Sequence, residues 1–144
     1  MATEQLVFDH VPNSVRALAM AGIGAFALGA IAVWYFDPTT AGFFPVCPLL
    51  RFTGFACPGC GLTRGFHALF HGDVVTALDY NALIPLFIFL FGYIIASLVS
   101  VAVRGRAIVA LEKKLIFLWT LLGILITFGV LRNLPFYPFT ILFP

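Results

Sequence analysis

Three long uncharged stretches constrain this chain more than any other feature of its sequence. They cover residues 17–36, 82–103 and 115–131, are mostly apolar, and are each followed by a charged residue. Crossing a bilayer core of roughly 30 Å takes about 20 apolar residues in a helix. Lipid offers no partners for free backbone groups, and a helix satisfies its own groups within the segment. The stretches therefore predict an all-α integral membrane protein with three transmembrane helices.

The composition supports a membrane protein and argues against other classes. Of the 144 residues, 62% are hydrophobic and 10% are charged, whereas soluble domains are nearer a quarter charged. The net charge is +2, and no run of Lys or Arg is present to neutralise phosphates, so no nucleic-acid partner is expected. We expect a single membrane domain over residues 1–144, with the lipid bilayer as its environment.

The positive charges predict how the chain is oriented in the membrane. Lys and Arg in short loops are retained in the cytoplasm. The connection between the second and third stretches carries four basic residues, whereas the longer segment 37–80 has only Arg51 and Arg64. We therefore expect the N-terminus and the connection at 104–114 to lie inside. Segment 37–80 and the C-terminus are then expected outside.

Small residues recur along two of the stretches at a spacing that can bring helices together. Because lipid gives no hydrophobic drive between helices, their association depends on close backbone approach. The residues recur every four positions: Ala17, Ala21, Ala25 and Gly29, then Gly92, Ala96 and Ser100. We interpret these faces as packing seams toward each other, a second copy or another membrane subunit. Small residues are also simply common in membrane helices.

The segment 43–72 is too apolar to be a simple linker. Its apolar positions 62, 66, 69 and 70 have helical spacing, and Gly72-Asp73 follows as a stop signal. We expect a short interfacial or re-entrant helix over 62–71. A hairpin should precede this helix and pack on the outer ends of the transmembrane helices, where protein can satisfy its backbone.

All three cysteines of the chain lie in this hairpin, as Cys47, Cys57 and Cys60. Cys57 and Cys60 enclose Pro58-Gly59 and lead directly into the expected helix, whose N–H groups and dipole would lower a thiol pKa. Prolines and glycines around the cysteines let the chain fold back on itself. The three sulfurs are therefore expected to lie in one cluster near the start of the helix.

Three chemistries fit such a cluster, and the sequence leaves them open. A disulfide from Cys47 to Cys57 or Cys60 would staple the hairpin, which an oxidising exterior permits. In a redox interpretation, Cys57 and Cys60 cycle between dithiol and disulfide, Cys47 exchanges electrons with them or with a membrane quinone, and Arg64 favours the thiolate. In a metal-binding interpretation, Cys47, Cys57 and Cys60 bind zinc or another thiophilic metal as three thiolates, with a fourth ligand from His or solvent.

Two nearby histidines, His67 and His71, share one face of the expected helix. With a rise of 1.5 Å per residue, His67 would lie roughly 7 to 10 Å from Cys60, too far for a common ion. We interpret both as polar residues at the lipid boundary. The six acidic residues are scattered and no phosphate-binding loop is present, so no other catalytic arrangement is expected.

Several residues of this segment occur together in a known family. They are Cys47-Pro48, Gly54, Cys57-Pro58-Gly59-Cys60-Gly61-Leu62-Thr63-Arg64, Gly72, Ala77 and Tyr80-Asn81. In these residues the chain resembles the bacterial membrane-protein family called domain of unknown function 2752, over about residues 45–95. The resemblance implies a small protein of the bacterial cytoplasmic (inner) membrane and no particular activity. It implies that the shared site residues are Cys47, Cys57, Cys60, Arg64 and Asn81.

Two classes of function follow from these observations. The sequence favours an accessory or structural membrane module whose outer cysteine site is either stapled by a disulfide or bound to a metal. It leaves open an enzyme, a quinone-linked thiol oxidoreductase that uses Cys57-Pro58-Gly59-Cys60.

Overall fold

The computed structural model describes residues 11–106, 115–137 and 142, and in these residues it contains helices and no strands. The expected all-α class is thereby confirmed. The helices are α1 Asn13–Tyr35, α2 Pro48–Thr53, α3 Leu62–Phe70, α4 Val74–Tyr80, α5 Ile84–Arg104 and α6 Leu115–Leu131. The three uncharged stretches correspond to α1, α5 and α6.

Two of these helices are long and apolar enough to cross a membrane. α1 has 23 residues and α5 has 21, and only 6% and 0% of their most apolar windows are buried inside the protein. The core helix of a soluble protein would be mostly buried instead, so both helices are compatible with insertion in lipid. α6 is apolar but has 17 residues. The third span predicted from the sequence is therefore not established.

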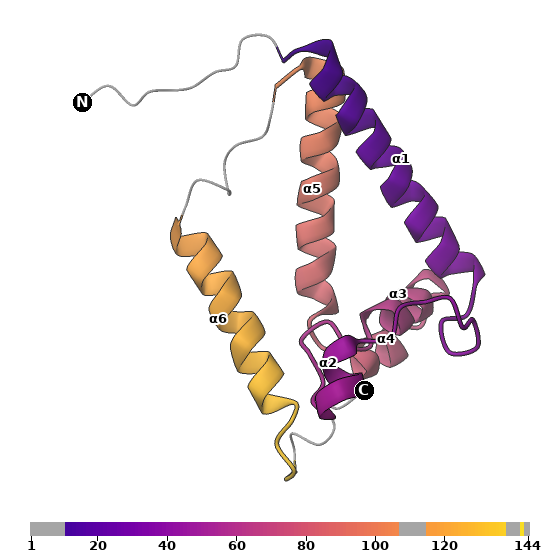
Figure 1. Ribbon diagram of the computed structural model, residues 1–144, viewed down its shortest axis with the longest axis vertical. Helices are drawn as coiled ribbons and strands as arrows, with labels where there is room; N and C mark the ends of the chain where they lie inside the picture. Colours follow the sequence, from indigo (N-terminus) through magenta and orange to yellow (C-terminus); the bar gives the residue numbers. More distant parts are fainter. Residues whose placement is uncertain (1–10, 107–114, 138–141, 143–144) are drawn as a thin grey trace.

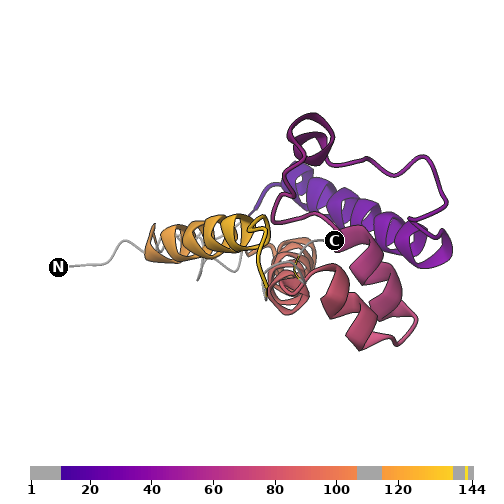
Figure 2. The ribbon, with the colours of Figure 1, turned by 90° about the horizontal axis from the view of Figure 1, so that it is seen from below.

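α1 and α5 meet at one end of the molecule and separate toward the other (Figure 1). α1 and α5 lie together at the top of Figure 1, where α1 begins and α5 ends, and α6 stands apart from α1. The short helices α2, α3 and α4 lie at the lower end. Seen from below, α6 extends to one side of α5 and α1 lies on the other side (Figure 2).

α1 and α5 pack by direct side-chain contact. A Cβ added at Gly22 would lie 3.4 Å from Leu98 Cδ1, which is ordinary van der Waals contact. The rings of Phe26 and Phe91 meet edge to face, with 5.6 Å between their centroids, an arrangement that aromatic pairs favour. Shape and apolar surface therefore define this contact.

The small-residue seams predicted from the sequence do not form that contact. On α1 the seam residues are all exposed: Ala17, Ala21, Ala25 and Gly29. A Cβ added at Gly29, or at Gly92 in the seam of α5, would meet nothing within 4 Å. The two seams therefore do not meet each other, because a spacing of four residues selects a helix face without selecting its neighbour.

The helix predicted over 62–71 is α3, and a second short helix that was not predicted follows it. Asp73 begins α4, because its Oδ1 accepts the Thr76 N–H at 3.0 Å, as an N-cap does. Hydrogen bonding to Thr76 also lowers the pKa of Asp73. Gly72-Asp73 thus separates two helices. α3 and α4 approach closely at Gly65, where an added Cβ would overlap the Ile84 side chain and crowd the Ala77 carbonyl.

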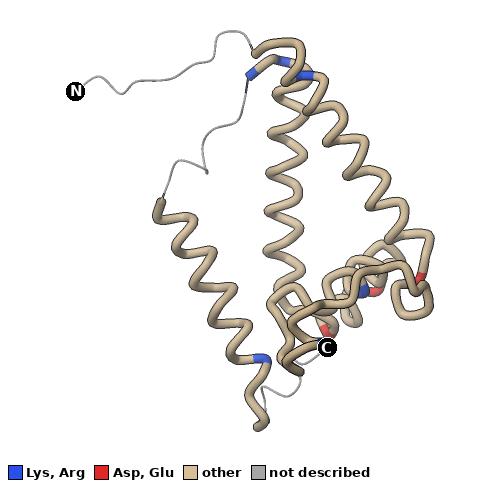
Figure 3. Tube along the Cα trace, in the orientation of Figure 1, with Lys and Arg blue, Asp and Glu red and all other residues tan. Residues whose placement is uncertain are grey.

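Acidic residues are confined to one half of the described molecule, whereas basic residues lie at both ends (Figure 3). Basic residues at the start of α1 and the end of α5 lie at the top of Figure 3, and acidic residues of the described chain lie in its lower half. Arg16 also links the two helices at the basic end, since its Nε and Nη2 donate to the Ala102 carbonyl at 3.1 and 2.9 Å. The lower, opposite end carries the cysteines.

Candidate metal centre

Two turns of the chain bring the three cysteines together. Cys47 directly precedes α2, and Cys57 and Cys60 bracket a tight turn in which the Cys60 N–H donates to the Cys57 carbonyl at 3.0 Å. We call residues 57–60 the CPGC turn. Gly61 follows it with a φ of 80°, a left-handed conformation that favours glycine and directs the chain into α3.

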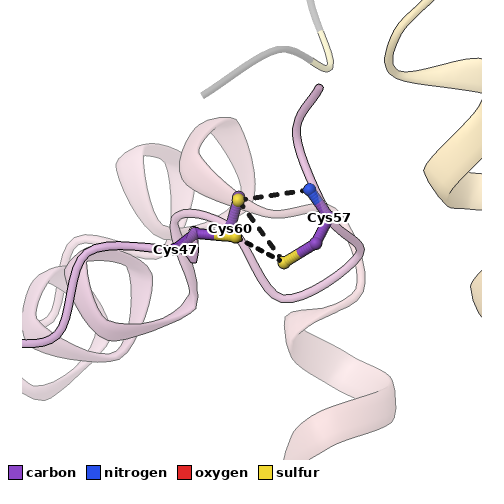
Figure 4. A group of neighbouring side chains, drawn as sticks. All are labelled: Cys47, Cys57 and Cys60. Carbon is purple, nitrogen blue, oxygen red and sulfur yellow. Dashed lines mark hydrogen bonds between the residues drawn. The ribbon is translucent and has the colours of Figure 1, made fainter. Parts of the chain in front are cut away.

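The cysteine side chains point toward one another (Figure 4). Cys57 Sγ lies 3.3 Å from Cys47 Sγ and 3.4 Å from Cys60 Sγ, and all three sulfurs lie within 4.8 Å of one another. The predicted clustering of the cysteines is therefore present. All three cysteines are free, so the disulfide considered from the sequence is not formed in this structure.

Backbone amides and burial act differently on the sulfurs. Hydrogen bonding by the Leu50 backbone lowers the pKa of Cys47 to about 7, since it stabilises the thiolate. The Cys57 N–H donates to Cys60 Sγ at 3.2 Å, yet burial raises the pKa of Cys60 to about 12. The sequence predicted a lowered thiol pKa where the CPGC turn enters α3. At Cys60 burial reverses that expectation, and the lowered pKa is found at Cys47.

Arg132, just after α6, is fully buried behind the CPGC turn, with 0% exposure. Its Nη1 donates to the carbonyls of Cys57 and Cys60 at 2.9 and 3.1 Å, and its Nε donates to the Leu142 carbonyl at 3.1 Å. Its Nη2 has no hydrogen-bond partner among the described residues. Burial lowers the pKa of Arg132, and the negative charge of cysteine thiolates opposes that effect. Because an unpaired buried cation costs several kcal/mol, this position favours negative charge on the sulfurs.

Two asparagines also make hydrogen bonds to the backbone at the CPGC turn and just before it. Asn81 is 1% exposed and donates from Nδ2 to the carbonyls of Pro58 and Cys60 at 2.8 and 3.1 Å. Asn133 binds both backbone groups of Ala56, accepting its N–H on Oδ1 and donating from Nδ2 to its carbonyl, each at 2.8 Å. Backbone groups outside helices are thus satisfied by side chains, as is required where water is scarce.

We call Asn81, Arg132 and Asn133 the polar clamp. Only Asn81 was chosen from the sequence, in which Arg132 and Asn133 directly follow the third uncharged stretch. One available signal was that an ionisable residue at the edge of an apolar stretch usually pairs inside the protein. No sequence pattern named the cysteine backbone as its partner.

The cysteines also line a cavity of about 410 Å³. Its wall includes Thr63 and Arg64 from the first turn of α3. Cys47 and Cys57 are half-buried, whereas Cys60 is buried. The cluster is therefore reachable from this cavity, while the polar clamp holds the backbone of the turn.

The remaining candidate residues lie beside the cluster and outside it. Arg64 is exposed, with its guanidinium carbon 5.9 Å from the centroid of the Tyr80 ring. His67 Nδ1 lies 2.7 Å from the Val33 carbonyl oxygen, and His71 Nδ1 lies 2.8 Å from the His67 carbonyl oxygen. Within the described chain, the group of potential metal ligands at this site contains the three cysteines and neither histidine.

Fold and site define an all-helical protein with two candidate membrane spans and a three-cysteine cluster at one end. Residues 47–95 match the family model described as "Protein of unknown function (DUF2752)", which is the family that this segment of the sequence resembles. The matched segment includes the three cysteines, Arg64 and Asn81, and it does not reach Arg132 or Asn133. No curated protein and no solved structure matches the chain.

Proposed function

We propose that this chain is an accessory membrane module in which Cys47, Cys57 and Cys60 bind a thiophilic metal ion such as zinc. The convergence of three free cysteines carries the proposal. Thiolates at about 2.3 Å from one tetrahedral ion lie roughly 3.8 Å apart. The sulfur separations of 3.3 and 3.4 Å need only a small outward adjustment to accept an ion.

The charge of Arg132 supports a metal–thiolate centre over the other chemistries. Cysteines that bind a metal lose their protons, so a divalent ion with three thiolates carries one net negative charge. Arg132 supplies one positive charge, fully buried and hydrogen-bonded only to neutral carbonyls of the described chain. Neither a disulfide with a protonated third cysteine nor three neutral thiols would balance that charge. Asn81 would act as a positioning residue, since it holds two carbonyls of the CPGC turn.

Metal analysis of the purified protein tests this function. Protein extracted in detergent under reducing conditions should contain about one zinc per chain, measured by elemental mass spectrometry. Cys57→Ser and Cys60→Ser should each lose most of that metal. His67→Ala is the matched control and should retain it. Unchanged metal content in both cysteine variants would rule out the site, as would a thiol count showing that two of the cysteines are oxidised.

We also propose that the cysteine cluster lies on the outer face of the cytoplasmic membrane, with the N-terminus inside. The basic residues at the start of α1 and the end of α5 support this orientation, together with the connection at 104–114, which carries four basic residues in the sequence. A maleimide that cannot cross membranes should label the metal-free cysteines when added to intact cells. Labelling that requires broken cells would reverse the orientation.

The exposed small-residue faces of α1 and α5 are the surfaces we propose for a second copy or another membrane subunit.

The alternative activity, a quinone-linked thiol oxidoreductase, is not favoured. A dithiol that exchanges with a disulfide depends on its thiolate fraction. Burial raises the pKa of Cys60 to about 12, which opposes thiolate formation at this thiol of the CPGC pair. The family description indicates no activity either.

A further inference from the structure

Three protein ligands leave a tetrahedral metal ion one ligand short. Structural zinc sites are usually closed by four protein ligands, whereas sites that act on a bound molecule keep one position open. Among the residues that the structure describes, the cluster comprises Cys47, Cys57 and Cys60, with no further His, Cys, Asp or Glu in the group. The missing ligand would therefore come from outside the described chain.

The cavity beside the cysteines is large enough to admit such a ligand. Its volume is about 410 Å³, whereas one water molecule takes up about 30 Å³ in the liquid. All three cysteines line it, together with Gly59 and Gly61, which carry no side chains to fill the space. A small molecule in this cavity would reach the sulfur cluster directly.

Arg64 gives the cavity a preference for negative charge. It lines the same wall as the cysteines, and the contact that the structure gives its guanidinium is the face of the Tyr80 ring. No carboxylate pairs with it in the described part of the chain, so its hydrogen-bond donors are available to a ligand. Guanidinium groups bind anions by charge-assisted hydrogen bonds.

We propose that this cavity admits a small anionic ligand that completes the coordination of the metal held by Cys47, Cys57 and Cys60 and pairs with Arg64. This inference rests on the proposed metal site and makes it a ligand-exchange site instead of a sealed structural one. A divalent ion with three thiolates and one anionic ligand carries two negative charges. Arg132 behind the turn and Arg64 in the cavity wall carry two positive charges, so the assembly is balanced.

The test uses the full-length protein in detergent, loaded with cobalt(II) as a coloured substitute for zinc. Thiolate-to-cobalt charge-transfer absorption reports the three sulfur ligands, and the visible d–d bands report the remaining position. Azide should shift the d–d bands in a saturable way and leave the charge-transfer band in place. Imidazole, a neutral ligand, should bind less tightly. Arg64→Gln should weaken azide binding about threefold to fivefold, as expected for an exposed charge pair.

Arg51→Gln is the matched control, since Arg51 is an exposed arginine of the same segment that does not line the cavity. Its azide affinity should equal that of the unaltered protein. If the charge-transfer band forms and azide produces no shift, the site is closed and this inference fails while the metal site stands. If azide shifts the bands equally in both arginine variants, Arg64 is not the anion's partner. If no charge-transfer band forms, the proposed metal site fails and this inference with it.

Discussion

The long helices are attached to the rest of the protein in two different ways. α1 and α5 meet along their sides, through contacts such as Gly22 with Leu98 and Phe26 with Phe91. α6 is held at its C-terminal end, where Arg132 and Asn133 make side-chain hydrogen bonds to the backbone at and just before the CPGC turn. One attachment depends on shape, and the other depends on polar groups.

This difference has consequences for what each attachment can specify. If α1 and α5 are inserted in a bilayer, as we propose, lipid tails are as apolar as their side chains, so a packing contact can be exchanged for lipid at small cost. The carbonyls of the turn are bound by the buried side chain of Arg132, and a buried carbonyl that loses its partner costs free energy, so the bonds from α6 cannot be exchanged in the same way. We therefore expect changes at the α6 attachment to disturb the cysteine site. Changes between α1 and α5 should alter stability alone.

Arg132→Gln should have the largest effect. It removes a buried positive charge and the two bonds from Nη1 to the Cys57 and Cys60 carbonyls. Loss of groups that support metal ligands typically weakens metal binding about 10- to 100-fold, and we expect zinc affinity to fall by that factor in competition with a chelator. Arg51→Gln is the control for loss of an arginine charge. Equal affinity in both variants would mean that Arg132 acts on the fold without supporting the site.

Asn133→Ala should destabilise the protein by about 1–3 kcal/mol, because it leaves the buried N–H and carbonyl of Ala56 without partners. Unfolding in mixed micelles measures the loss, and hydrogen exchange at the Ala56 amide should accelerate. Asn13→Ala, at the exposed first residue of α1, should change neither. If Ala56 exchange is unaffected, α6 is not anchored through Asn133.

Comparing Gly129→Ala with Gly123→Ala should distinguish the effect of α6 packing on stability from the effect of helix propensity. A Cβ at Gly129 would lie 3.2 Å from Pro58 Cγ, whereas a Cβ at Gly123 on the same helix would meet nothing within 4 Å. Both changes favour the helix by about 1 kcal/mol in stability. We expect Gly123→Ala to keep that gain, and Gly129→Ala to lose part of it and bind zinc about twofold to fivefold more weakly. Identical zinc affinities would show that α6 can shift without moving the turn.

Gly22→Ala should have the smallest effect. The added methyl would meet the flexible end of Leu98 at an ordinary contact distance of 3.4 Å. We therefore expect its stability change to lie within about 0.5 kcal/mol of that of the Gly24→Ala control. Zinc affinity should be unchanged in both variants. A loss of zinc in Gly22→Ala would show that the α1–α5 contact also supports the cysteine site, and the contrast between the two attachments would fail.

The elements that the sequence predicted correctly depend on local signals. The stretches 17–36, 82–103 and 115–131 coincide with α1, α5 and α6 within a few residues, because apolar length and flanking charge are properties of the segment itself. α3 was likewise found from its apolar spacing. α4 was missed because Asp73 can follow one helix or begin the next, and only its bond to Thr76 distinguishes the two.

At the cysteine site, the sequence by itself determined that three thiols share one short, bendable segment. Only the tertiary structure decided what surrounds them. Arg132 lies 75 positions from Cys57 and binds its carbonyl, and Asn133 binds Ala56 from the same distant end of α6. Every residue has a carbonyl, so a bond from a side chain to the backbone leaves no mark in the sequence of its acceptor. The polar clamp and the cavity therefore became visible only once the chain was folded.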